Sequence, residues 1–176
     1  MPPSTSTREN ALANIKTTLE AVTAGASYNY TIGEVYRADG PFFAYLDEVQ
    51  SETVAFIEEG QSSWTPDTHG GKWLVTLEVF IGIAHRYEPN DERPLSNTGE
   101  SKSTIRSKMI ADVIAALLAD NIRGGYALRG FRVTDDGPQN LDDIEDGENG
   151  PVWFLRPWVA HEVRFEMAMI VDESTP

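Results

Sequence analysis

The sequence predicts an α+β fold: a mostly antiparallel sheet with two long strands, packed against two main α-helices, with long polar loops. The long strands are the first observation. Trp73–His85 and Pro157–Val171 alternate apolar and other residues far beyond a typical strand of about five or six residues. Second, two other segments repeat apolar residues at the three- and four-residue steps of amphipathic helices. At a rise of about 3.3 Å per residue, these strands are longer than a small core needs. This length favours a subunit of an assembly.

Length and composition indicate one domain over residues 1–176, with flexible ends at 1–7 and 172–176. The absence of cysteine excludes disulfide bonds and thiol catalysis. The 28 acidic and 14 basic residues give a net charge of −14, which disfavours a protein that wraps nucleic acid through phosphate contacts. No apolar run reaches the roughly 20 residues of a membrane span, and no signal-peptide pattern opens the chain. We therefore expect a soluble protein of the cytoplasm or of a particle.

The first helix is expected to start at the capping-box pair Ser6 and Glu9. Its apolar stripe is formed by Leu12, Ile15, Leu19 and Val22, and Gly25 is a suitable residue to end it. A strand is expected to follow over Tyr28–Tyr36.

The segment between this strand and the first long strand is less regular. Phe42–Leu46 is either a short helical turn or a buried strand, and its pattern does not decide between them. Thr53–Glu58 is a candidate short strand, and Gln61–Gly71 is expected to be a mobile loop.

The second helix carries the strongest single pattern in the chain and is expected to lie across the sheet. It should begin near Ser101 or Ser103 and end near Asn121, with Arg123 close to its negative end. Its wide apolar face contains Ile105, Met109, Ile110, Val113, Ile114, Leu117 and Leu118.

Two loops and one further strand complete the expected order. Residues 88–100 form a polar loop, Ala127–Thr134 is a candidate strand, and residues 135–150 form an acidic loop.

No catalytic motif is present, so we expect no enzyme and no cofactor. The three histidines do not have metal-ligand spacing; His161 is expected in the core and His85 on the surface. When Gly147 is aligned as the glycine of an EF-hand loop, Ile144 and Trp153 fall at ligand positions, so that match fails. A looser divalent-cation site in the acidic loop stays open as an alternative.

Two segments resemble the tail terminator (tail-completion) proteins of long-tailed bacteriophages. They are Asn10–Val22 and Tyr28–Arg37. The remaining expected elements follow in the same order, so the resemblance covers roughly residues 9–171. It rests on the overall pattern and on no catalytic signature.

That resemblance implies a structural virion protein, assembled in the host cytoplasm and located at the head-proximal end of the tail. Such proteins form a ring, commonly a hexamer, on the last ring of the tail tube protein and stop tube polymerisation. The ring presents a surface to the head-tail connector protein, and DNA passes through its channel without specific binding. The alternatives are another head-tail connector or neck protein, and a small acidic metal-binding module or enzyme.

The residues themselves suggest three candidate surfaces, each with a plainer interpretation. Glu162, Arg164 and Glu166 alternate in charge and could pair with a neighbouring subunit, or form a solvated strand face. Trp64 and His69 could contact the tail tube, although a lone tryptophan more often packs on its own core. The acidic residues that could border the channel, or simply be solvated, are Asp142, Asp143, Glu145 and Asp146.

Overall fold

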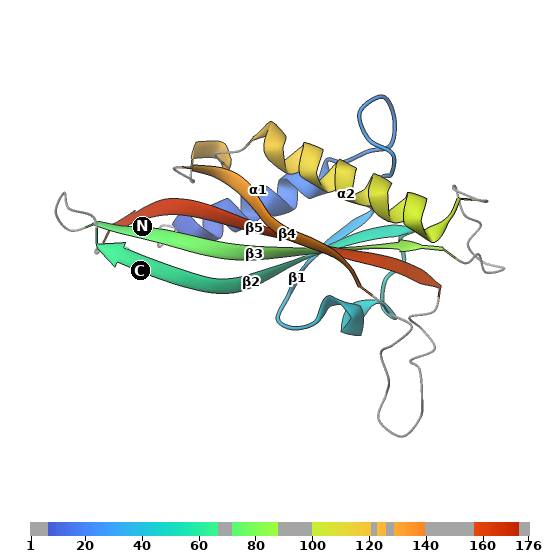
Figure 1. Cartoon of the computed structure of the whole chain (residues 1–176), viewed down its shortest axis with the longest axis horizontal. Coiled ribbons are helices and arrows are strands. Elements are labelled where there is room, and N and C mark those ends of the chain that lie inside the picture. Colours follow the sequence, from blue (N-terminus) through green and yellow to red (C-terminus); the bar gives the residue numbers. More distant parts are fainter. Residues whose placement is uncertain are drawn as a thin grey trace, which may run out of the picture.

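In the computed structural model, a five-stranded sheet carries both long helices on one face and a short 3-10 helix on the other (Figure 1). The structure describes residues 7–66, 72–87, 100–120, 123–125, 129–139 and 157–172. We call the face under the long helices the inner face and the opposite one the outer face. This architecture confirms the predicted α+β class.

The sheet has the strand order β1-β2-β3-β5-β4, and only the β1–β2 pair is parallel. Its strands are β1 (Glu34–Ala38), β2 (Thr53–Pro66), β3 (Lys72–Arg86), β4 (Arg129–Gln139) and β5 (Trp158–Asp172). Strands β3 and β5 are the two predicted long strands. They pair along their whole length, from Lys72 opposite Asp172 to Arg86 opposite Trp158.

Helix α1 (Thr7–Glu20) buries Leu12, Ile15 and Leu19 of its predicted stripe. Helix α2 (Lys102–Ala119) buries Ile105, Met109, Val113 and Leu117, but its predicted apolar face was too wide, because Leu118 is 45% exposed and Ile110 and Ile114 are only partly buried. The Ser101 hydroxyl caps α2 by accepting from the Thr104 amide at 3.2 Å. After α2, the single turn η2 (Arg123–Gly125) has positive φ at all three residues, and the buried Arg123 guanidinium donates to the Leu117 carbonyl. Within the described residues, no helix is long and apolar enough to cross a membrane.

Two predictions about the first fifty residues are wrong. Helix α1 ends at Glu20 and not at Gly25, whose amide donates to the Tyr28 carbonyl inside the following loop. The strand predicted over Tyr28–Tyr36 is present only from Glu34. The reason is that the amides of Asn29 and Tyr30 donate to the Asp112 carboxylate of α2, each at 2.9 Å, and so do not join a strand.

Strands β2 and β4 are both longer than predicted. Strand β2 has a β-bulge between Glu59 and Ser62 and continues beyond Gly60 to Pro66. Residues Gln61–Pro66 are therefore strand and not loop. Residues 135–139 belong to β4 and not to an acidic loop, because they pair with residues 160–164 of β5. The rest of the predicted acidic loop lies outside the described residues.

The outer face has a small core of its own at one end of the sheet. The run Phe42–Leu46, which its pattern left open between helical turn and strand, forms the 3-10 helix η1 (Phe42–Tyr45). The buried residues of this core are Ala38, Phe42, Leu46, Val49, Val54, Phe56, Ala84, Trp158 and Ala160. The main core lies between the inner face and the two helices.

Gly82 of β3 determines how η1 sits on the sheet. A Cβ atom at this position would lie 2.5 Å from the ring of Phe42. We predict that Gly82→Ala lowers the free energy of unfolding by about 1–3 kcal/mol, because Phe42 must shift and loosen the small core. Denaturant unfolding measures this. Gly137→Ala is the control, since nothing lies within 4 Å of its added Cβ; equal losses for both variants would contradict the prediction.

Candidate assembly surface

Beyond η1, the outer face of the sheet is not covered by any other described residue. The small core ends near Gly82, and β3 and β5 continue past it with their outer side chains partly or fully exposed. We define this uncovered face as Leu74, Thr76, Glu78 and Phe80 of β3 and Arg164, Glu166, Ala168 and Ile170 of β5. Leu74 is 37% exposed. On the inner face, the same stretches are fully buried.

The structure places the candidate interface residues Glu162, Arg164 and Glu166 on the outer face, as the alternation predicts. The guanidinium carbon of Arg164 lies 5.0 Å from the centroid of the Phe80 ring, and its Nε lies 3.3 Å from Glu162 Oε1. Arg164 therefore already has a cation–π and an ion-pair contact within its own subunit.

Glu166 has a less favourable neighbour. It lies directly opposite Glu78 in the β3–β5 register, and like charges in this position are destabilising. Both carboxylates line a shallow hollow of about 230 Å³ together with Gln61, Ser62, Ser63 and Thr76. On its other side, Glu166 lies opposite Arg132 of β4, so a cation of the same subunit offsets part of this repulsion.

Trp64, the candidate tail-tube contact, lies in β2 and not in a loop. It pairs with Val75 of the inner face, so it lies on the opposite side of the sheet from the charged candidates. Its ring packs edge-to-face on Trp73 with 6.4 Å between ring centroids, yet it remains 50% exposed. His69, Asp142, Asp143, Glu145 and Asp146 lie outside the described residues.

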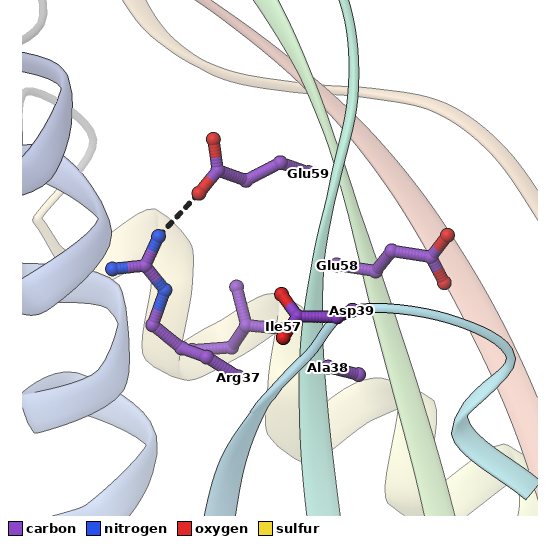
Figure 2. Close-up of a pocket in the computed structure, with 6 residues that line it drawn as sticks. All are labelled: Arg37, Ala38, Asp39, Ile57, Glu58 and Glu59. Carbon is purple, nitrogen blue, oxygen red and sulfur yellow. Dashed lines mark hydrogen bonds and ion pairs between the residues drawn. The ribbon is translucent and has the colours of Figure 1, made fainter. Parts of the chain in front are cut away.

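An ion-pair network anchors α1 where β1 ends, around a cavity of about 270 Å³ (Figure 2). Arg37 of β1 donates to Glu9 of α1 at 2.6 and 2.7 Å and to Glu59 of β2. Arg8 donates to the same Glu59 at 2.7 Å. Hydrogen bonding to Glu9 is the main cause that raises the pKa of Arg37. These charges are satisfied within the subunit, so this site holds elements together.

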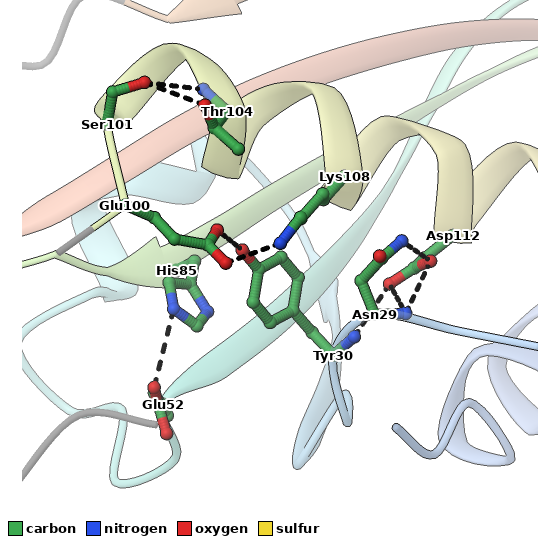
Figure 3. A network of polar contacts seen from close by, with 9 residues as sticks. All are labelled: Asn29, Tyr30, Glu52, His85, Glu100, Ser101, Thr104, Lys108 and Asp112. Atoms are coloured by element: carbon green, nitrogen blue, oxygen red, sulfur yellow. Dashed lines mark hydrogen bonds and ion pairs between the residues drawn. The ribbon is translucent and has the colours of Figure 1, made fainter. Parts of the chain in front are cut away.

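A second polar cluster joins α2 to the loop before β1 (Figure 3). Asp112 is buried on α2. Its carboxylate accepts hydrogen bonds from the backbone amides of Asn29 and Tyr30 and from the Asn29 side chain, the last at 2.8 Å. The Tyr30 hydroxyl donates to Glu100 at 2.9 Å, and Lys108 pairs with the same carboxylate at 2.5 Å. Lys108 and then Tyr30 lower the pKa of Glu100. No local sequence pattern indicates this cluster, because its members are far apart in the chain.

His85 belongs to this cluster and is buried, so its predicted surface position is wrong. Its ring packs against the tilted ring of Tyr30, with 4.4 Å between centroids, and its Nδ1 lies 2.7 Å from the Thr53 hydroxyl. It is the last residue but one of β3, where the loop before β1 and the Thr53 end of β2 cover it.

No group of three or more histidine and acidic side chains in the described residues could hold a metal ion. No protein-family model and no curated protein matches this chain. The surfaces and charges of the molecule are therefore the features that bear on its function.

His161 is buried on the inner face, as predicted, with its Nε2 3.2 Å from Asp136 Oδ1. Burial lowers the pKa of His161 below the ordinary 6.5; Asp136 and Glu162 act in the opposite direction, and Arg106 acts with burial. A lowered imidazole pKa favours the neutral form in the folded state, so protonation opposes folding.

We predict that the wild-type protein loses more unfolding free energy than His161→Gln when the pH falls from 7 to 5. The contribution of His161 is fully present above about pH 6.5 and is lost as the pH falls towards its folded-state pKa. Chemical denaturation at each pH measures this, with imidazole NMR titration as the direct check. Parallel pH profiles for the two proteins would contradict it.

Proposed function

We propose that this protein is a tail terminator: a non-enzymatic virion protein that caps the phage tail tube as a ring, stops its polymerisation and forms the surface that joins the tail to the head connector. The observation that carries the proposal is the uncovered face. An antiparallel sheet with one solvated face normally carries polar residues there. This face instead carries Leu74, Phe80 and Ile170 beside its charged residues. Apolar side chains grouped in this way are typical of a surface that another protein covers.

The fold and the charge support the same proposal. The two helices and the long strands follow in the order of the tail terminator resemblance, from α1 through β3 and α2 to β5. A net charge of −14 per chain suits a ring that lets DNA pass without retaining it.

The test is polymerisation of purified tail tube protein with and without this protein. We expect added protein to shorten the distribution of tube lengths in proportion to its concentration, with a ring at one tube end in electron micrographs. Bovine serum albumin at equal concentration, which is also acidic, controls for non-specific effects. Unchanged tube lengths and bare ends would reject the capping function, and binding to connector alone would favour a neck protein.

Association should depend strongly on salt. Six copies at −14 each bring together roughly −84 charges, and screening over about 8–10 Å near physiological ionic strength weakens their repulsion. We predict monomers or weak oligomers at low salt, and rings that increase with salt or on contact with tube ends. Light scattering across a salt series measures this. A stable hexamer in dilute low-salt buffer would contradict the prediction.

A further inference from the structure

Strand β2 has a free hydrogen-bonding edge along its second half. Strand β1 pairs with it only as far as Ala38 opposite Glu58, whereas β3 follows it to Pro66. Beyond Glu58, no described strand pairs with β2 on the β1 side, and Figure 1 shows β1 along only one half of β2. An edge of this kind presents a row of unpaired N–H and C=O groups. We call Gln61–Thr65 the free edge of β2.

The other margins of the sheet carry features that oppose further pairing. Strand β4 has two irregularities in its register against β5, and it contains Pro138 and the consecutive acidic residues Asp135 and Asp136. Strand β1 has only five residues, two of which are charged. Bulges, prolines, charges and short strands all block edge-to-edge association. The free edge of β2 has a bulge only where it begins, carries neither a charge nor a proline, and is mostly exposed.

The carboxylate of Glu78 reaches from β3 over β2, towards the start of the free edge. A Cβ atom at Gly60 would lie 2.8 Å from Glu78 Oε2 and 2.4 Å from the Phe80 ring, so the glycine leaves the space that both side chains occupy. Glu78 is half-buried and forms no hydrogen bond or ion pair with any described residue. Arg132, which faces Glu166, is two strands away from it on β4. An unpaired carboxylate therefore lies beside the free edge.

Two further carboxylates lie where β1 ends. Asp39 and Glu58 line the cavity of about 270 Å³ together with Glu59, and Figure 2 shows Glu58 and Glu59 on opposite sides of β2. Glu59 is paired with Arg37, whereas Asp39 and Glu58 form no hydrogen bond or ion pair with a described residue. Between Arg37 and Lys72 the sequence has no lysine or arginine. A segment that extends along β2 from the end of β1 therefore meets negative charge that its own subunit does not neutralise.

An aromatic ring flanks the free edge on the inner face. Trp64 belongs to this edge, packs edge-to-face on Trp73 and is half exposed. In neighbouring strands, side chains directly opposite each other have Cβ atoms about 4.5–5.5 Å apart. An inward-facing residue of an added strand would therefore lie against the Trp64 ring, while its outward-facing residues would lie on the side of Glu78.

We propose that the free edge of β2 binds an extended, basic segment of another protein, which adds a strand to the sheet. Backbone hydrogen bonds to Gln61–Thr65 hold the segment. One of its apolar or aromatic side chains packs on Trp64, and a lysine or arginine pairs with Glu78 above Gly60. The negative charge along the edge selects a basic partner over a second copy of this chain. This binding goes beyond the capping function and does not require a ring.

The probe is a capped peptide of about seven residues in which lysine alternates with tyrosine, long enough to span the free edge at about 3.3 Å per residue. Amide hydrogen exchange of the full chain, followed by NMR, measures the binding. We expect the peptide to slow exchange at Gln61–Thr65 and to leave the amides of β4 unchanged. A control peptide with the same side chains and alternate N-methylated backbone nitrogens keeps the charge but cannot pair. It should bind about tenfold more weakly or worse.

Glu78→Gln tests the ion pair. This variant should bind the lysine–tyrosine peptide about three- to tenfold more weakly, because it loses a charge-assisted contact. Glu48→Gln removes the same charge from an exposed position after η1 and should leave the affinity unchanged. Equal melting temperatures would show that both variants fold. Equal effects of the two substitutions would contradict the role of Glu78 and overturn the proposal.

The remaining outcomes are equally decisive. Equal affinity for the two peptides would show charge attraction alone, and protection at β4 would show that the wrong edge was chosen. Slower exchange at the free edge that increases with protein concentration, without peptide, would assign this edge to a second copy. Each of these results, or no binding at millimolar peptide, would overturn the proposal. Since no tube protein takes part, the result is independent of the capping test.

Discussion

The pairing of β3 with β5 is the constraint on which the rest of the structure depends. These strands hydrogen-bond from one end to the other and occupy the centre of the sheet, with β2 and β4 on either side. Their length fixes a sheet whose inner face needs two helices to cover it. Among the described residues, η1 and the turn that follows it cover only one end of the outer face. The surface that we propose for assembly follows from this mismatch between strand length and covering layers.

Burial of Asp112 determines how the helical layer meets the sheet. A buried carboxylate is tolerated when several N–H groups donate to it, and here the amides of Asn29 and Tyr30 do so. The same bonds hold Tyr30 against His85 and bring its hydroxyl to Glu100, close to the start of α2. The ion pairs of Arg37 with Glu9 and Glu59 perform the corresponding role for α1. Both helices are thus held by polar contacts as well as by apolar burial.

The proposed ring connects these features to function. The long strands present the uncovered face on one side of the sheet, and the two polar clusters hold the helix layer on the other side. Under the proposed function, the net charge of −14 per chain opposes association, so that assembly would depend on screening or on a tube end.

Residue periodicity alone determined the α+β class, both long strands, both helices and the common face of Glu162, Arg164 and Glu166. Period-2 and period-3.6 patterns report which side of an element is buried, and that information is local. Only the tertiary structure decided the end of β2, the loop conformation at Asn29 and the burial of His85. In each case the cause lies far along the chain: the register against β3, the carboxylate of Asp112, and the rings and strands that cover a strand end. The uncovered face likewise became visible only in three dimensions, because it requires knowing which surfaces the other described elements leave bare.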